Sequence, residues 1–161
     1  MSNKFSWPKR YDKEEAKSGV WFEVYNELDQ YYGSYRLALF NASAKHVIVE
    51  IDRWNRKNQE LIKSRKIKGD QGLIKAFVDI ALLDWKDVPL GPDGKDLPFS
   101  KETAFELLTD AEDEDSFLAT SLVKLAGDVT NFAGSIVKKD DDEEVIEAGD
   151  IEAEQEEDAK N

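Results

Sequence analysis

The sequence predicts an α+β fold in which an N-terminal β-hairpin is followed by a mostly helical domain of about four helices and a disordered acidic C-terminal tail. Three observations support this prediction. Two runs rich in β-branched and aromatic residues lie near the start of the chain. From residue 44 to residue 136, apolar residues recur mostly at helical spacing. Residues 140–161 then contain twelve acids and one base.

The hairpin is predicted from residues 20–25, VWFEVY, and residues 35–40, YRLALF. Both runs suit a strand, and the residues between them form a long connection. Two strands alone are marginally stable in water, so we expect them to pack against a helix or another chain. Residues 1–18 are polar and slightly basic with few apolar anchors, and they are predicted to form a flexible arm.

Four helices are predicted after the hairpin. The first covers residues 44–68 and has a net charge of +5, from eight bases and three acids. The second begins after Asp70, a candidate N-cap, and extends to about Trp85. A loop rich in proline and glycine separates it from a short third helix that opens at Ser100. The last helix begins near Asp115.

The last predicted helix carries an apolar seam with steps of four and three residues. Such spacing is typical of a helix that packs against another helix. The seam consists of Leu118, Leu122, Leu125, Val129, Phe132 and Ile136. It is either a face buried in the domain's own core or a contact surface for a partner. If it binds a partner, the contact positions are expected towards the tail, at Leu125, Val129, Phe132 and Ile136.

The acidity of the chain is concentrated at its C-terminal end. The formal net charge is -13, of which residues 140–161 contribute -11. Residues 139–161 have too few apolar side chains to offset the entropy of ordering, so they are predicted to form a disordered tail. Residues 19–138 are then the folded domain. A functional tail would bind a basic surface, first of all the +5 segment of the same chain or of a neighbouring copy, in a salt-sensitive contact.

The sequence predicts no catalytic, metal or cofactor site. It has no cysteine, and its only histidine, His46, has no nucleophile or carboxylate cluster at a triad-like spacing. Residues 84–96 contain four aspartates but lack the EF-hand pattern, and there is no phosphate-binding glycine loop. No apolar run could span a membrane or serve as a signal peptide. We therefore expect a protein that is not an enzyme, holds no cofactor, and binds neither nucleic acid nor a membrane.

An ordered series of short motifs resembles a family of bacteriophage tail assembly chaperones. Residues 19–25, GVWFEVY, resemble its glycine-aromatic opening strand, and residues 35–41, YRLALFN, its second strand. The strongest likeness lies in ALLDWKDV, DG, LPFSKE and LLTD, which occur in the family's order within residues 81–110. Residues 126–132, with Asn131 and Phe132, resemble the final helix. The resemblance covers about residues 19–134.

The resemblance also suggests a structural role for two aromatic residues. Trp85 lies in the tryptophan motif, and Phe99 lies in the proline-aromatic-serine motif. We expect these two side chains to clamp the proline- and glycine-rich loop to the core. Such a role would stabilise the fold and would not indicate what the protein does.

The resemblance implies a phage protein of the host bacterial cytoplasm that binds the tape measure protein and recruits tail tube subunits. Self-association is left open. One alternative is a structural component of the virion, in the tail or at the head-to-tail junction, with the seam buried between identical copies. Another is that the acidic tail imitates nucleic acid and occupies basic proteins.

Overall fold

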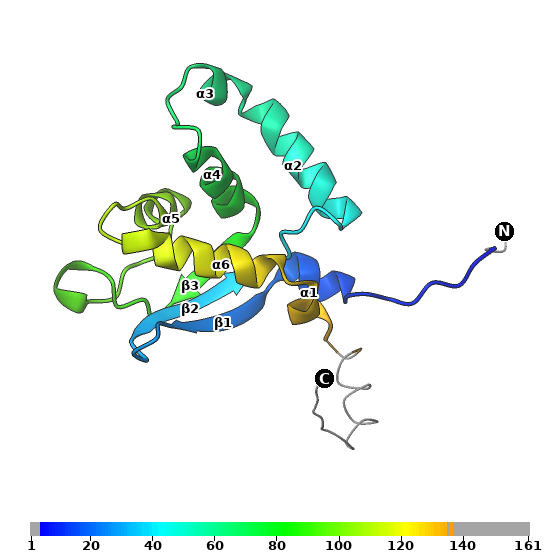
Figure 1. The fold of residues 1–161 in the computed structure, drawn as a ribbon, viewed down its shortest axis with the longest axis horizontal. Coiled ribbons are helices and arrows are strands. Elements are labelled where there is room, and N and C mark those ends of the chain that lie inside the picture. Colours follow the sequence, from blue (N-terminus) through cyan, green and yellow to red (C-terminus); the bar gives the residue numbers. More distant parts are fainter. Residues whose placement is uncertain (1–3, 135, 137–161) are drawn as a thin grey trace.

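The computed structural model describes residues 4–134 and Ile136 (Figure 1). The predicted α+β class is confirmed, because an antiparallel sheet is combined with helices that mostly follow its first two strands. The tail predicted for residues 139–161 lies outside the described residues. Residues 4–10 extend away from the body, with Phe5 and Trp7 exposed.

The sheet has three antiparallel strands in the order β1-β2-β3. These are β1 (Val20–Tyr25), β2 (Tyr31–Leu37) and β3 (Leu82–Lys86). The predicted hairpin is β1 and β2, although its second strand begins and ends earlier than expected. Tyr35 on the central strand pairs with Phe22 on one side and Trp85 on the other. Gly33 has a φ of 115°, and a Cβ there would lie 2.5 Å from Val88 Cγ2, so only glycine fits this position.

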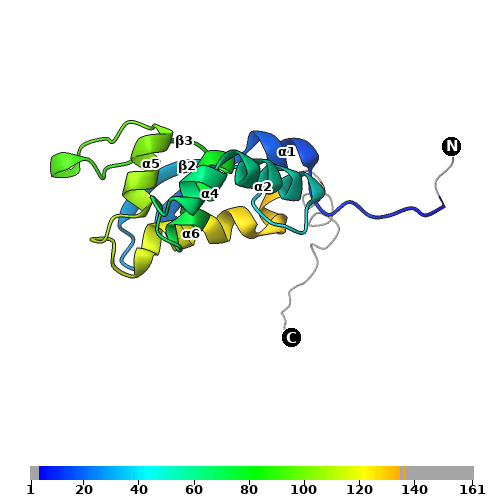
Figure 2. The ribbon, with the colours of Figure 1, turned by 90° about the horizontal axis from the view of Figure 1, so that it is seen from above.

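Some of the helices pack against the sheet, and the others lie farther from it. They are α1 (Lys13–Ser18), α2 (Lys45–Lys57), α3 (Gln59–Lys63), α4 (Gln71–Ile80), α5 (Lys101–Leu108) and α6 (Phe117–Gly127). Helix α6 packs on β2, and α4 packs on β3 and α5. Helix α2 lies alongside α4 in both views, on the side away from the sheet, and α3 continues beyond it (Figures 1 and 2).

The third strand corrects the predicted extent of the second helix. The apolar spacing predicted a helix to about Trp85, but α4 ends at Ile80 and residues 82–86 pair with β2. The Lys101 ammonium occupies this junction, donating to the carbonyl oxygens of Val78 and Leu82, each at 2.6 Å. Pairing with β2 and the cation at the end of α4 together stabilise a strand at residues 82–86. This stabilisation is larger than the preference of the local apolar spacing for a helix.

Helix α1 corrects the prediction of a flexible arm over residues 1–18. The Asp12 carboxylate caps this helix by accepting from the backbone N–H groups of Glu14 and Glu15. Ala16 is fully buried, and its carbonyl accepts from the Leu39 N–H at 2.8 Å. Residues 13–18 are therefore tied to the end of the hairpin by contacts that are distant in sequence.

Two apolar clusters make up the core. The first lies between the sheet and helices α4, α5 and α6, and its largest fully buried side chains include Tyr35, Phe77 and Leu122. The second is smaller and joins α1, the start of α2 and the segment after α6. It consists of Ala16, Leu39, Ala44, Val47 and Phe132.

The predicted seam is divided between these clusters instead of forming one helical face. Helix α6 ends at Gly127, and after Asp128 a short 3-10 helix, η3 (Val129–Phe132), takes the chain in a new direction. Asp128 caps η3 by accepting from the Thr130 N–H. As a result, Leu122 belongs to the first cluster and Phe132 to the second.

We expect Phe132→Asp to destabilise the domain as severely as Leu122→Asp. Both side chains are fully buried, so each substitution places an unpaired carboxylate in an apolar cluster, at a cost of several kcal/mol. Urea unfolding followed by tryptophan fluorescence measures the effect. Leu73→Asp is the control, since that side chain is 58% exposed. A native-like midpoint for Phe132→Asp would show that the second cluster does not support the fold.

We expect Lys101→Met to lower the free energy of unfolding by about 1–3 kcal/mol, because two carbonyl oxygens lose a charged donor. The methionine side chain retains most of the apolar packing of the lysine stem. Lys95→Met, at an exposed loop position, should change the free energy of unfolding little. Equal stability of the two variants in urea titrations would show that the ammonium group of Lys101 does not stabilise the fold.

Candidate partner-binding groove

A groove of about 820 Å³ lies between α1, α2, α4 and the segment that follows β2. It is open to solvent along one side of α2. Its apolar lining includes Ala16, Leu39, Val47, Val49, Trp54 and Ile80. Of these, Val49 is half exposed, so the groove offers apolar surface to a partner as well as to the core.

Helix α2 forms one wall of the groove and is attached to the body at two places. Near its start, Ala44 and Val47 are buried in the second cluster. Near its end, the Trp54 indole N–H donates to Asp79 Oδ2 of α4 at 2.8 Å. These residues and Ile51 fall on one helical face at spacings of three and four. The wall is therefore held at both ends while the surface beside it stays open.

Polar contacts fix the two attachments. At the start of α2, the Asn41 side chain donates to the Gly127 carbonyl at 2.6 Å and accepts from the Ser43 N–H at 2.8 Å. At the end, Lys75 pairs with Asp79 at 3.0 Å and stabilises the carboxylate that receives Trp54. The groove is thus built by residues from four different parts of the chain.

The ionisable lining of the groove contains three bases, two acids and one histidine. It consists of Lys17, His46, Glu50, Arg53, Lys57 and Asp79. Arg53 pairs with Glu50 at 3.0 Å. Burial, together with Lys17 and Lys13, lowers the pKa of His46, although Glu50 opposes this shift. The imidazole is therefore neutral near pH 7 and adds to the apolar character of the groove.

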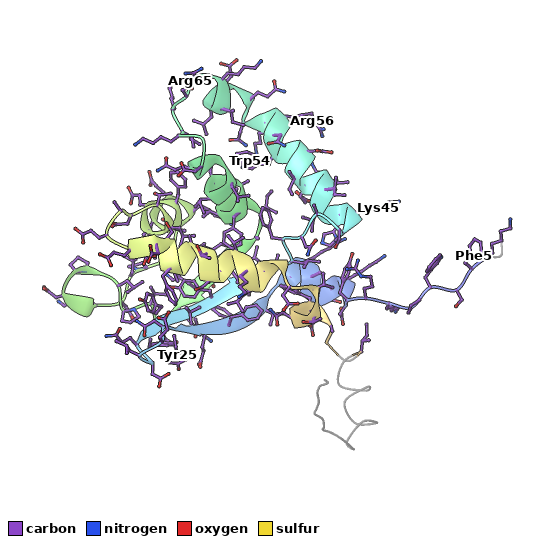
Figure 3. The ribbon with its side chains drawn as sticks, viewed as in Figure 1. Phe5, Tyr25, Lys45, Trp54, Arg56 and Arg65 are labelled. Atoms are coloured by element: carbon purple, nitrogen blue, oxygen red, sulfur yellow. The ribbon has the colours of Figure 1, made fainter. Side chains whose placement is uncertain are left out.

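Beyond the groove, the same helix continues into a basic surface. We call residues 44–68, which contain α2, α3 and the turn after α3, the basic arm. Its bases are Lys45, Arg53, Arg56, Lys57, Lys63, Arg65, Lys66 and Lys68. Lys45, Arg56 and Arg65 are spread along its length (Figure 3). Ile48, Val49 and Ile62 are 42%, 50% and 45% exposed on the same arm, so apolar and basic groups alternate there.

The seam residues named from the sequence do not line the groove. Phe132 is fully buried, so in this structure it is core and cannot be a contact position. Leu125 and Val129 are half-buried against the first and second clusters, and Ile136 is also half-buried. A contact role for these three remains a prediction. The groove residues were missed because the sequence could not show that α2 stands partly away from the body.

The structure does bring Trp85 and Phe99 together. Their ring centroids are 5.1 Å apart, with an angle of 80° between the planes. The Trp85 indole N–H also donates to the Leu97 carbonyl at 2.6 Å. The loop before α5 is therefore held against the third strand.

Among residues 4–134 and 136, no group of three or more His, Cys, Asp or Glu side chains is placed to hold a metal ion. None of the helices in that part is long and apolar enough to cross a membrane.

We expect Trp54→Phe to loosen α2 while leaving the sheet intact. The substitution keeps an aromatic ring but removes the hydrogen bond to Asp79, at a cost of about 1–2 kcal/mol. Amide hydrogen exchange should accelerate in α2 and remain unchanged in β2. Trp7→Phe is the matched control, because Trp7 is 80% exposed. Unchanged exchange in α2 would mean that Trp54 does not anchor the groove wall.

Comparison with known proteins gives a family. A family model described as YdaY prophage protein matches residues 40–160. A search of curated proteins found no match, and neither did a search of solved structures. The matched span includes α2 and α4, which form two walls of the groove, and it covers well over half of the chain. The chain is therefore phage-derived and belongs to the family of YdaY prophage proteins.

Proposed function

We propose that this protein is a phage tail assembly chaperone, which binds the tape measure protein and recruits tail tube subunits in the host bacterial cytoplasm. The observation that carries the proposal is the partly apolar groove beside α2, bordered by basic side chains. The prophage family indicates a phage origin. The resemblance over residues 19–134 supports a role in tail assembly. A protein of this kind acts by binding, and the proposal requires no cofactor or catalytic group.

The groove has the dimensions and chemistry to receive part of an amphipathic helix. Helix α2 is about 20 Å long, which matches about four turns of a client helix lying beside it. Two or three apolar side chains of the client, spaced three or four residues apart, would contact Val49, Ile80 and the edge of Trp54. Acidic side chains beside them would meet Lys17 and Lys57.

The partial exposure of the groove suits a temporary complex. Val49 is already about half exposed in the free protein, so covering it on binding stabilises the complex by a modest amount. The basic rim keeps the surface hydrated and limits self-aggregation. Such a surface could hold the apolar segments of a long helical protein until assembly, and then release them.

We expect Val49→Asp to abolish client binding while the fold is retained. Co-expression with a phage tape measure protein is the assay, and the measured quantity is the amount of tape measure protein that stays soluble and copurifies. Because Val49 is 50% exposed, the melting temperature should change little, but a carboxylate in the groove should reduce recovery at least about tenfold.

The matched control is Leu28→Asp, which introduces the same charge at a 79% exposed position in the hairpin loop. This variant should recover as much tape measure protein as the wild type. Equal recovery for both variants would place the binding site elsewhere. Mass spectrometry of purified particles tests the alternative of a structural virion component, and stoichiometric amounts of this protein in them would contradict a transient chaperone.

A further inference from the structure

We propose that the acidic segment of residues 140–161 binds the basic arm of the same chain and lies across the mouth of the groove. The occupant is thus a segment of this protein that follows the described residues. Three observations support it: opposite charge, the place where the described chain ends, and the length of chain that follows. The contact itself does not depend on the proposed function.

The two segments have complementary charge. The basic arm has a net charge of +5, and residues 140–161 have a net charge of -11. Within the described residues, Arg53 is the one base of the arm that pairs with a carboxylate. The remaining residues of the protein have a net charge of -7, so the arm is the largest local excess of positive charge available to the acidic segment.

The described chain ends next to one wall of the groove. Gly134 lies against Glu15 of α1, where an added Cβ would be 2.7 Å from Glu15 Oε2. The same helix supplies Ala16 and Lys17 to the groove. Residues 137–161 could extend up to about 80 Å, whereas α2 is about 20 Å long. The acidic segment can therefore reach the whole arm of its own chain.

Because the acidic segment and the basic arm belong to one chain, even a weak contact between them is favoured. Single exposed ion pairs contribute little, but a segment that belongs to the same chain as its binding surface has an effective concentration of about 1 mM there. The acidic segment also contains Val145 and Ile146. These apolar side chains could enter the groove beside Val49 while the flanking acids contact the arm.

The N-terminal arm is a less suitable occupant. Phe5 and Trp7 are exposed and apolar, but Lys4, Lys9 and Arg10 give this segment the same sign of charge as the basic arm. Repulsion would therefore oppose its approach. If the proposed function is correct, the acidic segment competes with the client for the groove, and a client must displace it.

Paramagnetic broadening in the full chain tests the contact. The protein has no cysteine, so Ala153→Cys provides a single position for a nitroxide label. We expect the label to broaden amide signals of α2 and α3 at about 0.05 M salt, and about 0.5 M salt should restore them because the attraction is screened. Signals of the hairpin loop, residues 26–30, should stay sharp.

Substitutions that reverse charges on the basic arm test whether it is the surface that the acidic segment binds. Arg56→Glu, Lys63→Glu and Arg65→Glu together should abolish the broadening of α2 and α3. The matched control reverses the same number of charges on the N-terminal arm, with Lys4→Glu, Lys9→Glu and Arg10→Glu, and should leave the broadening unchanged. Broadening that is absent at low salt, or that survives reversal in the basic arm, would overturn the proposal.

A mixed sample separates contact within one chain from contact between copies. Isotope-labelled protein without the nitroxide is combined with unlabelled protein that carries it. We expect no broadening in this sample, and broadening of α2 would replace the proposed contact with one between two copies. No tape measure protein is present, so failure here leaves the proposed function standing, and failure of the co-expression assay leaves this contact standing.

Discussion

The ammonium group of Lys101 holds the junction on which the rest of the structure depends. At this point α4 ends and β3 begins, so the carbonyl oxygens of Val78 and Leu82 lack the partners that a continuing helix would give them. With these oxygens satisfied, residues 82–86 can complete the sheet. The same junction fixes the direction of α4, and therefore the position of the Asp79 carboxylate that receives Trp54.

The groove follows from this arrangement because α2 has few contacts of its own. It is attached at its first turn through Val47 and near its last turn through Trp54, and α3 has no buried residue. A helix held at two places leaves part of its surface uncovered. That surface carries both apolar and basic groups, a combination that would destabilise a closed core but is suited to binding a segment from elsewhere.

The basic arm and the described end of the chain are far apart in the sequence, and the fold brings that end against α1, which forms one wall of the groove. The basic arm comes before α4, and the acidic segment follows the described end of the chain beside α1. Helix α1 also contributes Lys17 to the groove. The fold thus places the described end of the chain beside a surface from which it is distant in the sequence.

The sequence by itself determined the features that depend on near neighbours in the chain. These include the hairpin, the Ser100 cap that accepts from the Thr103 N–H, and the concentration of acids after residue 139. The tertiary structure alone decided α1, β3, the division of the seam and the groove. Each of these rests on contacts between distant segments, such as Ala16 with Leu39 or Trp54 with Asp79. Local spacing cannot specify such contacts, because a pattern like that of residues 82–86 suits a helix or a strand until the partner is in place.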